Sequence, residues 1–365
     1  MPSFIPPFCP NPGCPFHCPR EGWRWKRSGF FARKQLRPAR IQRYQCLHCH
    51  RTFSTQTFDC TYWLKRPEML ARIFHGSLAC SGLRQIAQEI GFAPATVQHQ
   101  LSRLGRHCLL FQHQLRPTVP AERLVLDGFE SFEYSQYFPF HFHVLIGKNS
   151  HFFYQFTDSP LRRKGRMTEA QQAHREVLER VLGRPDPKSI EKQVAELLSL
   201  ALPREGGTWA VHSDDHPAYP RAFRRLLPGI RIEHHVTSST ERRTPRNPLF
   251  PVNLVDLLIR HGGANHKRET IAFSKRRQGA IERLAIFQVW RNFMRPYSIR
   301  RGKGGPTPAE RAGVRAGKLS LQELLSRRLF ASQIRLPRLL GEYYGRETPT
   351  AALRTNRRHR LSYAF

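Results

Sequence analysis

Residues 124–132 read Leu124-Val125-Leu126-Asp127-Gly128-Phe129-Glu130-Ser131-Phe132, and this stretch decides the fold. Its aliphatic, β-branched and aromatic residues predict a strand with an aspartate in its middle. Two more runs of the same kind follow at 141–146 and 151–156, and the turn segments 137–139 and 148–150 separate the three runs. Short strands joined by short turns predict a three-stranded meander.

Segments of helical and of strand character alternate after the meander. We expect helices at 168–182 and 188–202, a strand at 209–211, a helix at 217–227, a strand at 230–235 and a long helix at 264–293. This order is that of an α/β, ribonuclease-H-like catalytic domain, a mixed five-stranded sheet with helices, here at 119–300 with a helical insertion at about 158–207. In such an order, acids on the first strand, at the end of the fourth strand and on the late helix meet at one sheet edge. Three carboxylates hold divalent ions, and hard oxygen ligands suit Mg²⁺, so we expect a pair of Mg²⁺ ions.

The charge of the chain indicates the class of partner. Its 365 residues include 60 Lys and Arg against 27 Asp and Glu, a formal charge of +33. Such an excess in a sequence with 39% hydrophobic residues is typical of a folded protein that binds a polyanion. Residues 119–269 hold 18 of the 27 acids and are nearly neutral, whereas both flanking segments are basic. No apolar run approaches the ~20 residues of a membrane helix, and the N-terminus does not resemble a signal peptide. We therefore expect no membrane partner and a cytoplasmic, nucleoid-associated protein.

The eight cysteines all lie in the first third of the chain. Cys9-x4-Cys14 and Cys46-x2-Cys49 form two short knuckles, which is the arrangement of a zinc ribbon. We predict a ribbon domain at 1–62 in which these four thiolates bind a structural Zn²⁺, with Cys18 or His17 as possible replacements for Cys14. The remaining thiols are interpreted as packing residues: Cys60, Cys80 and Cys108.

Residues 63–118 have the pattern of a helical DNA-binding domain. Apolar residues recur at helical spacing in 67–77 and 83–90, Gly91 ends the second segment, and a third helix begins near Pro94. Two short helices around a glycine turn, the second with a polar front, are typical of a helix-turn-helix. We expect that front to contact DNA through Thr96, Gln98, His99, Gln100 and Arg103.

Several motifs in this order resemble the DDE transposases of bacterial insertion sequences, in the subset with an N-terminal zinc ribbon and helix-turn-helix. The resemblance covers nearly the whole chain and is carried by Arg43-Tyr44-Gln45-Cys46-Leu47-His48-Cys49-His50-Arg51-Thr52-Phe53-Ser54, Leu83-Arg84-Gln85-Ile86-Ala87, Leu126-Asp127-Gly128, Ser213-Asp214-Asp215-His216-Pro217-Ala218-Tyr219, Arg268-Glu269-Thr270-Ile271-Ala272-Phe273-Ser274-Lys275-Arg276 and Thr307-Pro308-Ala309-Glu310-Arg311-Ala312-Gly313.

The resemblance implies that Asp127, Asp214 and Glu269 are the three catalytic acids and the ligands of Mg²⁺. Asp215 is the rival of Asp214, and its alternative role is to cap the helix that starts near Pro217. Glu282 is the rival of Glu269, and on one helix the two would point about 220° apart.

The segment between the second and third acid is longer than in many relatives, and an inserted loop at 237–251 accounts for it. Near the third acid we expect five cations to hold DNA phosphates: Lys267, Arg268, Lys275, Arg276 and Arg277.

These expectations describe a DNA transposase that binds the terminal repeats of an insertion sequence and cuts and rejoins strands. Its partners would be double-stranded DNA, as element ends and as target, and further copies of the chain in a homo-oligomer. The alternatives are a non-enzymatic DNA-binding regulator with an inactive ribonuclease-H-like scaffold, and an RNA-binding protein that uses the ribbon. Residues 301–365 are interpreted as a basic C-terminal tail.

Overall fold

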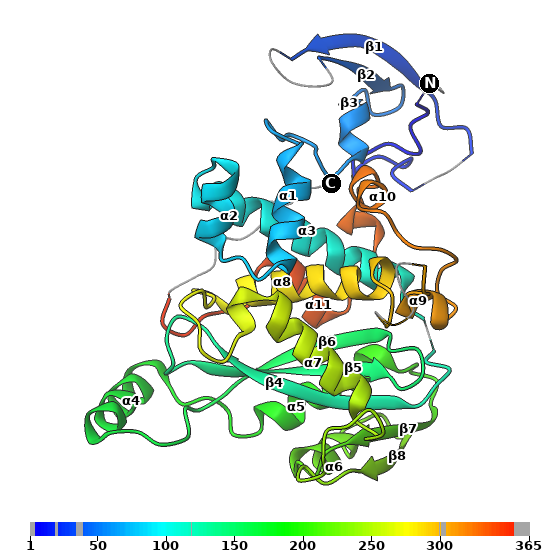
Figure 1. Cartoon of the computed structure of the whole chain (residues 1–365). Helices are drawn as coiled ribbons and strands as arrows, with labels where there is room; N and C mark the ends of the chain where they lie inside the picture. The colour runs from blue at the N-terminus through cyan, green and yellow to red at the C-terminus, as the bar shows by residue number, and fades with distance from the viewer. Residues whose placement is uncertain are drawn as a thin grey trace.

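The computed structural model describes residues 4–18, 21–33, 39–117, 119–298, 300 and 304–353. It contains a three-stranded antiparallel sheet, a group of three N-terminal helices and a five-stranded mixed sheet (Figure 1). No helix in these residues is long and apolar enough to cross a membrane.

The N-terminal sheet is built from β1 (Trp25–Ala32), β2 (Arg40–Cys46) and β3 (Thr52–Ser54) in that order. Tyr44 and Phe53 point to its buried side and stack on each other. Phe330, far along the chain, completes this small core. The opposite side is open, and β1 exposes Lys26, Arg27 and both of its phenylalanines.

Three helices follow, α1 (Met69–Leu78), α2 (Leu83–Ile90) and α3 (Pro94–Leu115). Their positions agree with the prediction, and Gly91 ends α2 at φ 69°, the left-handed conformation that glycine adopts without strain. The helix α3 is longer than a recognition helix requires, because its second half is buried against the rest of the molecule.

The central sheet has the strand order β6-β5-β4-β7-β8. Its strands are β4 (Leu124–Phe132), β5 (Pro139–Gly147), β6 (Phe153–Pro160), β7 (Gly207–Ser213) and β8 (Ile230–Val236). The first three pair antiparallel as predicted, whereas β7 pairs parallel to β4 and β8 pairs parallel to β7. This mixed sheet is consistent with the expected ribonuclease-H-like fold.

Helices cover both faces of this sheet. In Figure 1, α5 (Ser189–Ala201) lies on one side, and α7 (Phe250–Gly262) and α8 (Arg277–Val289) lie on the other. The short α6 (Ala218–Phe223) connects β7 to β8. The helix α7 was not expected from the sequence, and it begins at Phe250, within the last residues of the loop expected at 237–251.

The late helix differs from the prediction. Only a short 3-10 turn, Ala264–His266, forms at the expected start, and α8 begins at Arg277 rather than near residue 264. The hydroxyl of Thr270 donates to the carbonyl of Ala264 (2.9 Å) and accepts from the N–H of Ala272 (2.9 Å). A hydroxyl that bonds nearby backbone groups competes with helix formation, so this segment turns instead.

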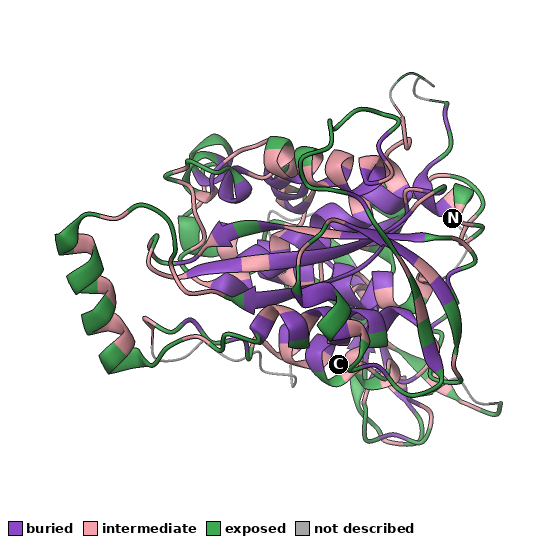
Figure 2. Cartoon of the chain, turned by 90° about the horizontal axis from the view of Figure 1, so that it is seen from below, coloured by how far each residue is buried: buried purple, intermediate pink, exposed green. Residues whose placement is uncertain are grey.

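The helix α4 (Glu169–Leu182) projects from the body of the molecule (Figures 1 and 2). Its apolar side chains include Val177, Leu178, Val181 and Leu182, but α4 has no buried residue and Val181 is 72% exposed. Capping by Thr168 and an ion pair between Arg162 and Glu179 (2.7 Å) hold the arm in place.

The described C-terminal residues 304–353 pack onto the other parts. They contain α9 (Pro308–Arg311), α10 (Leu321–Ser326) and α11 (Arg338–Gly345), of which Leu324, Leu340 and Tyr343 are buried. A single continuous core joins them to the three N-terminal helices and to the central sheet.

Candidate functional site

An open cleft of about 980 Å³ lies at one edge of the central sheet. Asp127 on β4 and Asp214, directly after β7, both line it. The parallel register pairs Val125 with His212, and Asp127 and Asp214 each lie two positions after these paired residues, so the two aspartates reach the same level. The expectation that these residues meet at one sheet edge therefore agrees with the backbone geometry.

A third aspartate, Asp256, enters the same cleft from α7. Its helix packs over β4 and β5 through Val252, Val255 and Ile259, and this packing aims Asp256 toward Asp127. Asp256 Oδ1 is buried and has no hydrogen-bond partner within the described part of the chain. A buried carboxylate oxygen without a donor is costly, so this atom indicates a place for a cation.

The acids of the cleft influence one another electrostatically. Burial raises the pKa of Asp127 to about 6, a bond from the Gly128 N–H partly offsets this, and the charge of Asp214 adds to it. Burial, together with repulsion from Asp127, holds the pKa of Asp256 well above its ordinary value. Carboxyl groups that raise one another's pKa are stabilised by a bound cation, which replaces their protons.

Cations surround the acids. The exposed side chains of Arg243, Lys164, Lys267 and Arg268 line the cleft. Arg243 comes from the loop before α7, and its positive charge lies close enough to offset part of the rise in pKa of both Asp127 and Asp256. This loop was expected from sequence, but the position of its arginine beside the acids was not. Acids in the centre and cations at the rim suit a ligand that carries phosphates.

The rival acids take different positions. Glu269 lines the cleft, but it is exposed and lies in the turn before α8, not on a helix. Glu282 is fully buried on α8, where it accepts from Ser102 (2.8 Å) and pairs with Arg346 (3.1 Å), away from the cleft. Asp215 accepts from the backbone and hydroxyl of Ser239 instead of lining the cleft.

The donor set of the cleft fits Mg²⁺. Its carboxylate oxygens are hard donors, and one of them, Asp256 Oδ1, is buried without a hydrogen-bond partner. Burial and the charge of Asp214 make the ionised form of Asp127 unfavourable in the absence of a cation. In the described residues, the carboxylates of the cleft are not among the side chains close enough together to form a candidate metal group; cysteine thiols form that group, and their ligand atoms all lie within 4.8 Å of one another.

That group consists of Cys9, Cys14, Cys46 and Cys49. The sulfurs of Cys9 and Cys49 are 3.6 Å apart, and those of Cys14 and Cys46 are 3.9 Å apart. Four sulfurs at the Zn–S distance of ~2.3 Å form a tetrahedron with edges of about 3.8 Å, so the site fits a zinc ion. The indole N–H of Trp23 donates to the sulfur of Cys46 (3.3 Å).

The two alternative ligands lie outside the cluster. Cys18 is exposed. Both ring nitrogens of His17 are engaged, one with the carbonyl of Cys9 (2.8 Å) and the other with the hydroxyl of Ser332 (2.7 Å). His17 therefore connects the cluster to the C-terminal segment.

The expected DNA-contacting residues divide into two groups. Thr96 and His99 are exposed on the first turns of α3, and Gln98 and Gln100 are half-buried. Arg103 takes a different position from the expected one, because its guanidinium donates to the carbonyls of Cys60 (2.8 Å) and Tyr62 (2.6 Å) and so braces the segment before α1. Lys275 is exposed over the ring of Phe273, and Arg276 is half-buried at the start of α8.

No protein-family model and no curated protein matches the sequence. Among solved structures, the chain is similar to a chain in the cryo-EM structure of a simian T-cell lymphotropic virus intasome in complex with the PP2A regulatory subunit B56 gamma. The match has 15% sequence identity and a TM-score of 0.26, and it covers 68% of this chain and 74% of that chain. At this TM-score the likeness supports no conclusion about fold or function.

Proposed function

We propose that this protein is a DNA transposase that binds the ends of an insertion sequence and performs metal-dependent cleavage and transfer of DNA strands. One observation carries the proposal: Asp127, Asp214 and Asp256 enter one cleft from three different elements, and cations surround them. A cleft with this charge pattern accommodates a phosphodiester backbone between the acids and the cations.

We propose Asp127 and Asp214 as two of the three catalytic ligands, and Asp256 as the third in preference to Glu269. Asp256 has the buried, unpartnered oxygen and the electrostatic coupling to Asp127, whereas Glu269 is exposed at the rim. Mg²⁺ at these carboxylates would supply charge stabilisation at the phosphate and a more acidic attacking hydroxyl.

The other residues of the cleft position the DNA. Arg243, Lys267 and Arg268 line the cleft with the acids and are proposed to provide phosphate contacts. Thr96 and His99 on α3, with Gln98 and Gln100 beside them, are proposed to contact base edges, and Lys275 and Arg276 to contact the backbone. The boundaries at 62, 118 and 300 are proposed as functional divisions of a chain whose helices and central sheet share one core.

The test begins with the duplex that the full-length protein selects from a random-sequence pool. Cleavage of this duplex is then measured with Mg²⁺ for Asp127→Asn, Asp214→Asn, Asp256→Asn and Glu269→Gln. The three aspartate variants should lose cleavage and keep binding, while Glu269→Gln should still cut. Asp215→Asn is the matched control, because it removes a neighbouring acid that faces Ser239.

Each contrary result has a definite meaning. If Glu269→Gln is inactive and Asp256→Asn cuts normally, Glu269 is the third acid. If the wild-type protein binds its duplex but never cuts it with Mg²⁺ or Mn²⁺, the protein is a regulator and the transposase proposal fails. If structured RNA displaces the duplex at matched salt, the ribbon is an RNA-binding module.

A homo-oligomer is part of the proposal, because joining two DNA ends requires two ends to be held together. Light scattering of the protein with and without its selected duplex measures this. A complex that contains one chain per two ends would contradict it.

A further inference from the structure

The turn formed by residues 267–273 presents one fully exposed apolar side chain. Ile271 is 99% exposed, the largest value among the exposed large hydrophobic residues of the described chain. It lies between Thr270 and Ala272, in the turn that Thr270 holds through its two hydrogen bonds, to the carbonyl of Ala264 and from the N–H of Ala272.

The turn is fixed at its base. The ring of Phe273 packs on Phe132 of β4 with ring centroids 5.1 Å apart. The carbonyl of Ser274 accepts the N–H of Tyr134 (3.0 Å), and the amide of Asn265 donates to the hydroxyl of Ser274 (3.2 Å). Ile271 therefore projects from a braced support, and its exposure is built into the local fold.

The turn lies between the cleft and the N-terminal helices. On one side, Glu269 and Thr270 line the cleft that contains Asp127 and Asp256. On the other side, Ala272 lies beside Gly82 at the start of α2, where an added Cβ would come within 3.4 Å of the alanine side chain. We therefore expect a duplex that contacts α3 and has a phosphate in the cleft to pass this turn.

The charges around Ile271 indicate the occupant of this surface. Lys267 and Arg268 precede it and Lys275 follows it, all with exposed side chains. An apolar surface for another protein chain has little use for three exposed cations around one isoleucine, whereas a DNA duplex offers phosphates to the cations and stacked bases to the apolar side chain.

We propose that Ile271 is a wedge that enters the base stack of double-stranded DNA beside the phosphate held in the cleft, and opens the duplex there. This inference rests on the proposed function. Its physical basis is the known use of apolar side chains to unstack a base step while cations hold the flanking phosphates.

The test uses the selected duplex with 2-aminopurine placed at successive positions, because this base becomes brighter when it loses its stacking partners. Ca²⁺ replaces Mg²⁺ so that the DNA is bound and not cut. The wild-type protein should raise the fluorescence several-fold at one step. Ile271→Ala and Ile271→Ser should lose this rise and keep binding, and Ile271→Leu should keep part of it. Val181→Ala, which trims another exposed apolar residue on α4, should behave as wild type.

Cleavage with Mg²⁺ supplies the second measurement. Ile271→Ala should cut the paired duplex more slowly than wild type, and a two-base mismatch at the same step should restore its rate. The mismatch should not restore Asp256→Asn, because unstacking does not replace a carboxylate.

Failure of the wedge and failure of the proposed function give different results. If the wild type cuts the duplex but no position brightens, or if Ile271→Ala equals wild type on paired DNA, the wedge is wrong and the transposase proposal stands. If the wild type binds without cutting, the proposed function fails. If Ile271→Ala changes the mass of the DNA-free protein in light scattering, the side chain is a contact between protomers and the wedge is wrong.

Discussion

Gly105 of α3 lies directly against the backbone of Glu282 in α8, and a Cβ at this glycine would come within 2.6 Å of the glutamate carbonyl oxygen. This close approach is possible only without a side chain, and it joins the helix proposed to read DNA to a helix that covers the central sheet. The polar pair of Ser102 and Glu282 (2.8 Å) lies at the same crossing.

Gly105→Ala should therefore destabilise the protein by about 1–3 kcal/mol, because the obstacle is backbone and cannot rotate away. Gly341→Ala on α11 is the matched control, since a Cβ there meets nothing within 4 Å. In an open helical position alanine is favoured over glycine by about 1 kcal/mol, so the control should be neutral or stabilising. Urea unfolding measures both, and an equal effect of the two substitutions would contradict the close helix contact.

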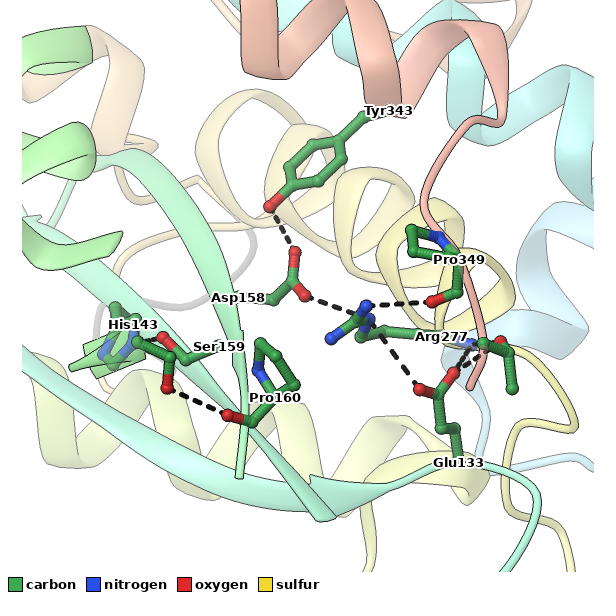
Figure 3. A network of polar contacts seen from close by, with 10 residues as sticks. Glu133, His143, Asp158, Ser159, Pro160, Arg277, Tyr343 and Pro349 are labelled. Carbon is green, nitrogen blue, oxygen red and sulfur yellow. Dashed lines mark hydrogen bonds and ion pairs between the residues drawn. The ribbon is translucent and has the colours of Figure 1, made fainter. Parts of the chain in front are cut away.

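Arg277 at the start of α8 joins the ends of two strands to the C-terminal segment (Figure 3). Its guanidinium pairs with Asp158 of β6 (3.1 Å) and donates to the carbonyl of Pro349 (2.9 Å), and its backbone N–H donates to Glu133 (2.6 Å). The hydroxyl of Tyr343 donates to the other oxygen of Asp158. All four side chains are buried.

Arg277→Met should cost about 3–5 kcal/mol, because it leaves two buried carboxylates without their cation. Tyr343→Phe should cost less, about 1–3 kcal/mol, because it removes one donor from Asp158. Arg338→Ala on the same helix as Tyr343 is the control: its pair with Glu342 is exposed, and such pairs contribute about 0.3–0.5 kcal/mol. Comparable losses of unfolding free energy in all three variants would show that the buried network is not special.

The pH dependence of stability follows from Asp127. Burial raises its pKa to about 6, against ~3.9 in an unfolded chain. Below pH ~4 the carboxyl is protonated in both states, whereas above pH ~6 the folded state carries a buried charge that the unfolded state exposes to water. The ion-free protein should therefore lose stability as the pH rises from about 4 to about 6.

Asp127→Asn removes this cost. In EDTA it should stabilise the protein by about 1–3 kcal/mol at pH 7 and have little effect at pH 4, while Mg²⁺ should stabilise the wild type and not the variant. Asp215→Asn should instead destabilise the protein at pH 7. Hydrogen bonds from Ser239 lower the pKa of the Asp215 carboxyl, so its charged form favours the folded state. A gain from Asp127→Asn that is equal at pH 4 and pH 7 would point to packing instead of ionisation.

The strands were predictable because their apolar runs and turns repeat along the chain, and the strand pairing agrees with the meander that residues 124–156 suggest. The helix α7 was not predictable, because Pro251 follows a polar, proline-rich segment and was interpreted as part of a loop. The structure places this proline in the first turn of α7, where its missing N–H costs nothing. Asp256 was missed for the same reason, since a single acid within an apolar helix has no motif of its own.

The polar residues of α3 show a different limit. Sequence places Arg103 on the same polar front as His99, but the periodicity of a helix does not show which polar groups face solvent and which face a neighbouring backbone. Only the packed structure shows that the carbonyls of Cys60 and Tyr62 take the Arg103 guanidinium. The cysteine knuckles were more informative, because four thiols at ligand spacing have few other arrangements.

The ribbon should depend on its metal for folding. Its core in the described residues has seven buried members, three of which are the ligands Cys9, Cys14 and Cys46, and one of which is Phe330 of the C-terminal segment. So small a core does not hold without the metal, and zinc binding to such modules is itself folding free energy of about 10–16 kcal/mol. The loss of zinc should therefore also release the segment around Phe330, which the ribbon holds through His17 and Ser332 (2.7 Å).

Cys46→Ser should lose stoichiometric zinc, measured by metal analysis, and trypsin should then cut quickly after Arg328, whose N–H bonds the carbonyl of Phe58 in the intact protein (2.8 Å). A strong chelator should produce the same cut in the wild type. Cys18→Ser removes an exposed thiol outside the cluster and should keep both the zinc and the resistance to trypsin. If Cys18→Ser loses zinc while Cys46→Ser retains it, the ligand set is wrong. If zinc leaves without any new cut, the C-terminal segment does not depend on the ribbon.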